Sequence, residues 1–286
     1  MNREGTMWKR WVVAVLAAGL TTGCYFSEDV QGNGDTVTEG RVTEGFVNVE
    51  NNSALSVVVT QGDVADVKVV IDSNLQPNVR TFVNAGQTLF IETDGEFNPR
   101  GQARVEVQLP RVVGITQNGS GSVRVEGFEQ GQDDVRLVTK GSGTLFFCGG
   151  ARTLDAKLHG SGSMELCTSG AQMAEWVDLT QTSSGELRWS GDAKLVRTAT
   201  DGSGRMTLSG VTHRLEARLD GSGRVDAQGL KAVDVDIMSL GSGNIVAFVD
   251  GGGVVVMLSA SGNVELFGHA LSTQARVNGS GRVIWH

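Results

Sequence analysis

Two cysteines have the spacing that most directly predicts a chemical bond. Cys148 and Cys167 each lie seven residues beyond the first glycine of a Gly-Ser-Gly sequence, at Gly141 and Gly160. If these sequences are equivalent corners of successive coils, the cysteines are vertical neighbours within the Cα separation of a disulfide. Two thiols alone lack the four ligands of a structural zinc site. We therefore expect a disulfide and no metal site, with two free, packed cysteines as the alternative.

Carboxylates at repeated positions raise the question of catalysis, because many carbohydrate-active enzymes use a pair of Asp or Glu side chains. Asp201 and Asp220 each precede a Gly-Ser-Gly sequence, while Arg205 and Arg224 each follow one. This order favours an exposed ladder in which each aspartate pairs with the arginine across its corner. The four histidines occupy different positions in the repeat and predict neither a triad nor a metal cluster. We expect no enzyme, and a carbohydrate-active enzyme is the alternative.

Two longer repeats carry insertions at what should be one shared corner. The insertions combine aromatic side chains with carboxylates, a mixture that suits a sugar or a peptide. They are two coils apart, so about 10 Å separates them. The alternative is a pair of loops that cover the edge of the core. The candidate ligand-binding residues are Phe128, Glu129, Asp133, Asp134, Glu175 and Trp176.

A repeat must position all of these residues. Gly-Ser-Gly begins at residues 119, 141, 160, 202, 221, 241 and 279, and degenerate copies begin at residues 183 and 260. The steps between successive copies are 22, 19, 23, 19, 19, 20, 19 and 19 residues. So constant a step indicates a structural repeat. The glycines suit corners that need a positive φ or leave little room, and the stacked serine hydroxyls should bond along the stack or to corner backbone groups.

The residues after each corner alternate as a half-buried strand does. The fourth and sixth residues past the start of every copy are apolar, as Leu166 and Leu208 are, and Glu165 and Thr207 precede them. A second alternating segment follows in each repeat. The pattern predicts an all-β fold, a single-chain right-handed parallel β-helix (a β-solenoid) with coils of roughly 19 residues and Gly-Ser-Gly corners. A leucine-rich horseshoe is disfavoured, because the repeat lacks a helical segment and an asparagine ladder.

The first residues have the pattern of an export signal. Basic residues at Lys9 and Arg10 precede an apolar run that is too short for a typical spanning helix, and Gly23-Cys24 follows it. We expect a signal peptide over residues 1–23, starting at Met1 or Met7, and a lipid on Cys24. An unmodified cysteine near an ordinary cleavage site is the alternative. Residues 24–45, rich in acidic side chains and glycine, should form a solvated tether.

The N-terminal part of the predicted β-helix carries a family resemblance. Asp72-Ser73-Asn74-Leu75, Thr88-Leu89-Phe90-Ile91 and Val105-Glu106-Val107-Gln108-Leu109-Pro110 come in this order ahead of Asn118-Gly119-Ser120-Gly121. This order resembles the putative auto-transporter adhesin family with a head GIN domain, found in bacterial envelopes. The resemblance runs from residue 46 to the end, with less regular coils over 46–118 and regular coils over 119–286. It implies a β-helix and supplies no catalytic residues.

Taken together, these features predict a non-catalytic, lipid-anchored protein of the bacterial cell envelope, most consistent with the outer membrane. It should act as an adhesin or binding scaffold without a cofactor, with a glycan or an envelope protein as ligand, and a purely structural spacer is a further alternative. The formal net charge of −8 argues against nucleic acid as a partner. The last repeat stops at His286 after its first strand, so its edge is a surface for self-association, with Trp285 as a partial lid.

Overall fold

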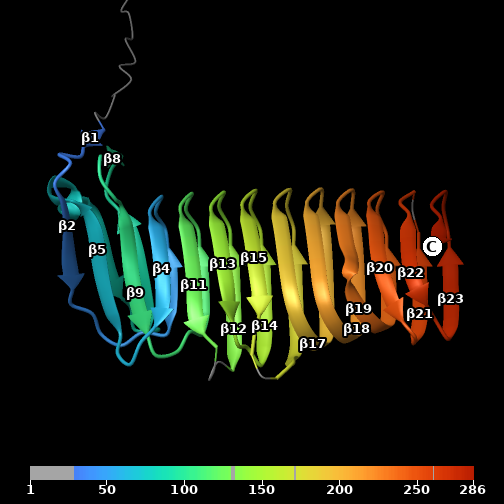
Figure 1. Ribbon diagram of the computed structural model, residues 1–286. Coiled ribbons are helices and arrows are strands. Elements are labelled where there is room, and N and C mark those ends of the chain that lie inside the picture. The colour runs from blue at the N-terminus through green and yellow to red at the C-terminus, as the bar shows by residue number, and fades with distance from the viewer. Residues whose placement is uncertain (1–28, 130–132, 171, 260) are drawn as a thin grey trace, which may run out of the picture.

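The computed structural model of this protein describes residues 29–129, 133–170, 172–259 and 261–286, and Cys24 with the expected signal peptide lies outside them. Strands stack side by side along one axis to form a solenoid (Figure 1), which confirms the predicted all-β class. In the part of the chain that is described, no helix has the length and apolarity needed to cross a membrane.

Each regular coil contributes one strand to each of two faces, which we call face A and face B. Face A contains β4 (Ser56–Gln61) and the strands that follow the Gly-Ser-Gly corners and their degenerate copies: β11 (Ser122–Phe128), β13 (Thr144–Gly149), β15 (Ser163–Thr168), β20 (Asn244–Asp250), β22 (Val264–His269) and β24 (Val283–Trp285). Face B contains the strands that precede them: β3 (Asn48–Asn51), β10 (Gly114–Gln117), β12 (Asp134–Thr139), β14 (Thr153–Leu158), β16 (Ala174–Gln181), β21 (Gly253–Leu258) and β23 (Ser272–Val277). Three long strands bend through both faces: β17 (Glu186–Gly202), β18 (Arg205–Gly221) and β19 (Arg224–Ser239).

The parallel register places equivalent repeat positions above one another. Leu166 of β15 is opposite Trp189 of β17, and Trp189 is opposite Leu208 of β18. All three side chains are buried, whereas Glu165 is exposed and Thr207 is half-buried. The core is therefore a continuous column of apolar side chains between the two faces, as the alternation predicts.

The corner glycines are required mainly because neighbouring coils approach closely. A Cβ built on Gly160 would overlap the carbonyl oxygen of Gly141, and one on Gly162 would overlap that of Gly143. A positive φ occurs at Gly202 (148°) and Gly221 (153°), but not at Gly160. The backbone conformation thus requires glycine at some corners, and the stacking distance excludes a side chain at nearly all of them.

The expected hydroxyl ladder is not found in the described part of the chain. The middle serines of the corners point outward and are exposed, and no hydrogen bond joins one to the next. Buried side chains stabilise the corners instead. The Gln117 amide nitrogen donates to the carbonyl oxygens of Gly119 and Gly121, each at 3.1 Å, and Gln181 donates to Gly185 in the same way. The serines are therefore available to solvent.

Antiparallel strands close the N-terminal end of the solenoid. On face A, β2 (Thr36–Arg41) pairs with β5 (Asp66–Asp72), which pairs with β9 (Arg104–Leu109), and both pairings are antiparallel. On face B, β6 (Val79–Val83) pairs antiparallel with β7 (Thr88–Thr93). The short 3₁₀ helix η1 (Ser73–Asn78) joins β5 to β6, and its Leu75 is fully buried. These elements cap the apolar column.

The predicted solvated tether is wrong for residues 30–41. β1 (Val30–Gln31) pairs with β8 (Phe97–Asn98), and β2 covers the outer edge of β5. Asp72 holds this segment in place: its carboxylate accepts hydrogen bonds from the backbone nitrogens of Arg100, Gly101 and Gly34. These bonds, led by that from Arg100, lower the pKa of Asp72. The physical reason is that an uncovered sheet edge exposes unpaired backbone groups, which β2 satisfies.

The irregular region 46–118 does not stack in chain order. The coil of β3 and β4 lies between the coil of β7 and β9 on one side and the coil of β10 and β11 on the other. After β2, the chain therefore forms the inner coil of β3 and β4, then the rest of the cap and the outer coil, and returns to the other side of the inner coil to begin the regular repeats.

The opposite end of the described solenoid has no comparable cover. Thr273, Ala275 and Val277 of β23 are in register with the buried Val254, Val256 and Leu258 of β21. All three are nevertheless exposed, because no further strand among the described residues packs beyond them. This edge is the surface at which the sequence predicts self-association.

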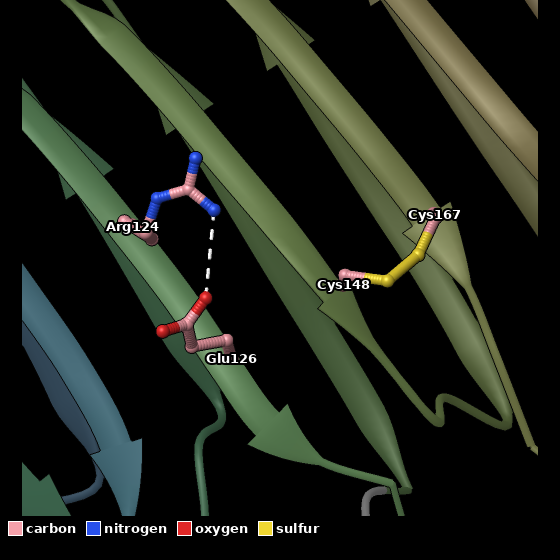
Figure 2. The surroundings of a disulfide bond; sticks show 4 residues. All are labelled: Arg124, Glu126, Cys148 and Cys167. Carbon is pink, nitrogen blue, oxygen red and sulfur yellow. Dashed lines mark hydrogen bonds and ion pairs between the residues drawn. A yellow bond between two sulfur atoms is a disulfide. The ribbon is translucent and has the colours of Figure 1, made fainter.

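The structure joins Cys148 of β13 to Cys167 of β15 by a disulfide (Figure 2). The two residues are opposite one another in the parallel register, and their Cα atoms are 4.6 Å apart. Nearby on β11, Arg124 pairs with Glu126 at 3.4 Å and lies over the ring of Phe146. The disulfide therefore links two adjacent coils on the outside of face A.

Core packing predicts unequal effects for two adjacent substitutions. Leu208→Ala should lower the free energy of unfolding by about 2–5 kcal/mol, because it leaves a cavity in the apolar column. Thr207→Ala should cost far less, because Thr207 is half-exposed on the outer side of the same strand. Chemical denaturation of both variants measures the difference. Equal losses would contradict the assignment of inner and outer sides.

The disulfide predicts protection of both thiols. In protein isolated from its native envelope, Cys148 and Cys167 should resist alkylation under denaturing, non-reducing conditions and react after reduction. The closed loop is about twenty residues long, so the loop-entropy model gives a stabilisation of roughly 3 kcal/mol. Mass spectrometry of the labelled peptides provides the readout. Full labelling of both cysteines without reductant would show that the bond does not form.

Candidate ligand-binding groove

The outer side of face B contains an open groove of 720 Å³ that crosses strands β14, β16, β17, β18, β19 and β21. Trp176 of β16 lines it near the N-terminal side, and Met257 of β21 lines it near the C-terminal side. The parallel register arranges the lining residues in rows that run along the solenoid axis. Because each row takes one residue from each coil, side chains far apart in the chain lie side by side.

One row is charged and forms a ladder of ion pairs. It takes Asp178, Arg197, Glu216 and Asp236 from successive strands. The Arg197 guanidinium lies 3.0 Å from the Glu216 carboxylate. Arg214 then bridges Glu216 and Asp236 from the neighbouring row. Most charges of this row are therefore already paired within the protein.

The adjacent row is mainly small or apolar. It takes Thr180, Ala199, Arg218, Met238 and Met257 from the same strands. Met257 is 42% exposed and Met238 is half-buried. The Arg218 guanidinium lies 3.3 Å from Asp220 on its own strand and donates to the Met238 sulfur on the next strand, at 3.1 Å. The groove thus presents an apolar strip beside a charged strip.

Asp178 is the incompletely paired member of the charged row. Its Oδ1 is buried and has no hydrogen-bond partner among the described residues, and the nearest cation is the Arg197 guanidinium at 3.9 Å. Burial raises the pKa of Asp178, and Arg197 acts in the opposite direction. Asp178 lies on the same strand as Trp176, two residues away, so both side chains project from the same side of β16. A partly exposed carboxylate with only a weak ion pair therefore lies close to an aromatic side chain.

The two insertions meet at one corner, and two of their carboxylates, those of Asp134 and Glu175, are already engaged. Asp134 is in register with Thr153, which is in register with Trp176, so the three occupy successive coils. Arg152 lies between Asp134, at 2.6 Å, and Glu175, at 3.2 Å. This cluster forms a polar rim close to Trp176. Glu129 and Asp133 are exposed and do not line the groove.

The prediction that Phe128 contacts a ligand is wrong, because Phe128 is fully buried in the core. The register between β11 and β13 shifts between Val125 and Phe128, and Gly127 there has a φ of 85°. This bulge rotates Phe128 inward, out of the alternation expected for the strand. Phe128 therefore fills the core beneath the corner.

The expected Asp–Arg pairs across the corners are also wrong. Asp220 pairs with Arg218 at 3.3 Å, and Arg224 pairs with Asp226 at 3.2 Å. The reason is geometric: residues two apart on a strand project from the same side, whereas residues across a corner diverge. Asp201 is opposite Asp220 in the register, but neither lines the groove.

A second hollow, of 640 Å³, follows the serine corners. It is lined by the outward serines Ser142, Ser161, Ser184, Ser203 and Ser222, by Ser163 and corner glycines, and by Glu186, Arg205 and Arg224. It contains no aromatic side chain. The face B groove, which has an aromatic side chain and apolar residues beside charged ones, is therefore the better candidate for a ligand-binding site.

Of the six predicted ligand-binding residues, the structure brings only Trp176 into the groove. Sequence reasoning did not identify Asp178, Arg197, Glu216 or Met238, although each occupies an outward position of an alternating strand. Methionines at outward positions are the signal that could have indicated an exposed apolar strip.

Comparisons with known proteins agree with this architecture. No curated protein matches the chain. A putative adhesin from Parabacteroides distasonis is 18% identical with a TM-score of 0.64, and the match covers 91% of this chain and 100% of that one. A putative adhesin from Parabacteroides merdae is 17% identical, with a TM-score of 0.63 and coverage of 90% and 99%. A putative lipid binding protein from Parabacteroides distasonis is 17% identical, with a TM-score of 0.60 and coverage of 91% and 100%.

These solved structures share the fold at low identity, so the family assignment comes from the sequence model. The model described as "Putative auto-transporter adhesin, head GIN domain" matches residues 45–174 and 168–270. The two matches together span most of the chain, including both the cap and the regular coils. The protein therefore belongs to the putative auto-transporter adhesin family with a head GIN domain.

Proposed function

We propose that this protein is a non-catalytic, lipid-anchored adhesin or binding scaffold of the bacterial cell envelope, held at the outer membrane through Cys24. The observation that carries the proposal is the groove on face B, where Trp176 and the partly exposed Asp178 carboxylate lie side by side on the sheet. Pre-formed sites of this kind bind with little cost in ordering the protein. Its family membership supports a role at the cell envelope or surface.

The position of the N-terminal strands suits such an anchor. β1 lies at the capped end of the solenoid, and β23 lies at the opposite end (Figure 1). A lipid attached upstream of β1 would hold the capped end near the membrane. The groove and the uncovered β23 edge would then extend away from it. Stable anchoring requires more than one acyl chain, which a lipidated N-terminal cysteine provides.

The groove supports binding more strongly than catalysis. Arg214 forms ion pairs with Glu216 and Asp236 in the groove. A carboxylate in such an ion pair is a poor general acid or base, so these residues favour a binding surface over a catalytic one. Asp201 and Asp220, the pair considered for an enzyme, are exposed outside the groove. A purely structural spacer would not explain a surface groove lined by Trp176 and apolar side chains, because such exposed apolar surfaces usually mark binding sites.

Lipid attachment predicts a defined mature N-terminus. Intact-mass and peptide mass spectrometry of envelope-derived protein should find Cys24 as the first residue, carrying acyl chains. Cys24→Ser should release the protein from the membrane fraction, because one polar substitution removes the acylated thiol. An unmodified N-terminus at any other residue would contradict the anchor.

Binding through the groove predicts that one aromatic residue controls ligand capture. The immobilised Trp176→Ala variant should capture much less material from native envelope extracts than the wild-type protein does. Phe146→Ala is the matched control, because Phe146 is a half-buried outward aromatic on face A. Thermal unfolding checks that both variants remain folded. Equal capture by the wild type and both variants would rule out the groove as the binding surface.

A further inference from the structure

We propose that the face B groove takes an uncharged, linear oligosaccharide, with one sugar ring stacked on Trp176 and a hydroxyl or amide N–H donated to Asp178. The inference rests on the proposed binding function and names its ligand class. Trp176, Asp178 and the two rows that run from them carry the argument.

The first step is the length of the groove. It crosses six strands, and adjacent strands are about 4.8 Å apart, so the rows extend over roughly 24 Å. This length exceeds a single sugar and suits a chain of several. The long axis follows the solenoid axis, so a linear ligand meets one residue of each row at every coil.

The second step is the amphipathic cross-section. Ala199, Met238 and Met257 form a largely apolar strip, interrupted by Arg218, beside the charged row of Arg197 and Glu216. A pyranose chain has the matching division, because its rings present C–H faces and its edges present hydroxyls. Aromatic and apolar side chains cover the faces, and charged groups bind the hydroxyl edges.

The third step is the direction of the hydrogen bond at Asp178. The Asp178 side chain lines the groove and is 35% exposed, and an ionised carboxylate only accepts hydrogen bonds, so the ligand must supply a donor there. A sugar hydroxyl or an N-acetyl N–H does so. A hydrogen bond to a charged acceptor is stronger than one between neutral groups, so this contact should contribute strongly to affinity.

The fourth step is the charge of the groove. Four carboxylates and three cationic side chains line it, which leaves an excess of one negative charge. The whole chain is also acidic, at −8. A uronate-rich or phosphorylated polymer is therefore repelled, and an uncharged chain is favoured.

A peptide fits these features less well. Peptides commonly add a strand to a free sheet edge, but the groove strands from β14 to β19 are paired on both sides. An extended peptide laid along the axis projects side chains to one side about every 6.6–6.8 Å, which does not match the coil spacing of about 4.8 Å. The rings of a pyranose chain follow one another at close to the coil spacing.

Isothermal titration calorimetry with defined oligosaccharides tests the proposal on the full-length protein in detergent. The probes are cellohexaose, hexa-N-acetylchitohexaose, their dimers, and hexagalacturonate as the acidic comparison. At least one uncharged hexamer should bind, more tightly than its dimer, and hexagalacturonate should bind at least about tenfold more weakly, a difference of about 1.4 kcal/mol.

Variants assign the binding to the groove. Trp176→Ala and Asp178→Ala should each weaken binding of the hexamer by about tenfold or more. Trp176→Phe should retain much of the affinity, because it keeps an aromatic platform, and Phe146→Ala should leave it unchanged. If Trp176→Phe and Phe146→Ala retain their affinity for the hexamer, the weaker binding of Trp176→Ala reflects a lost contact and not a lost fold.

The outcomes distinguish the ligand class from the proposed function. If no uncharged hexamer binds while envelope capture still depends on Trp176, the oligosaccharide is wrong and the binding function stands. Tighter binding of hexagalacturonate would also overturn the uncharged class. If capture does not depend on Trp176 either, both fail. Release of shorter sugars from a bound hexamer would overturn the non-catalytic assignment.

Discussion

The spacing between parallel coils is the constraint on which the rest of this structure depends. Backbone hydrogen bonds hold adjacent strands at one distance, and every corner must then fit the same gap. At Gly160 and Gly241 an added Cβ would overlap a carbonyl oxygen of the coil below. Glycine is needed there because two backbones nearly touch. The same spacing makes repeat positions into columns, which determines the neighbours of every side chain.

The columns explain both the core and the outer surface. Inward columns combine Leu166, Trp189 and Leu208 into one apolar interior, whose continuity stabilises coils too small to fold alone. Outward columns combine residues about 19 positions apart into rows, such as Arg197 with Glu216. The chemical character of an outward row is therefore set by the residue type at one equivalent position in each repeat. The groove on face B is therefore a property of the stacked repeats, and no single segment of the chain contains it.

The two ends of the described solenoid differ in whether other elements cover the apolar column. At the N-terminal end, β2, β5 and η1 turn the chain across the apolar column, and Asp72 ties β2 to the loop before β9. At the other end, β23 presents inward positions to solvent. A cap that contains antiparallel strands cannot continue a parallel stack, so any further stacking of like coils is restricted to the β23 end.

The sequence by itself determined the repeat, the inward and outward sides of the regular strands, and the alignment of Cys148 with Cys167. These follow from local alternation and equal offsets, which a constant coil length converts into contacts. Only the tertiary structure decided the rest. The order of coils around β3 and β4 depends on long-range pairing, the bulge at Gly127 turned Phe128 inward, and Arg152 engaged Asp134 and Glu175. The alternation shows which side of the sheet a residue occupies, but a groove also depends on side-chain size in neighbouring coils and on which charges find partners there.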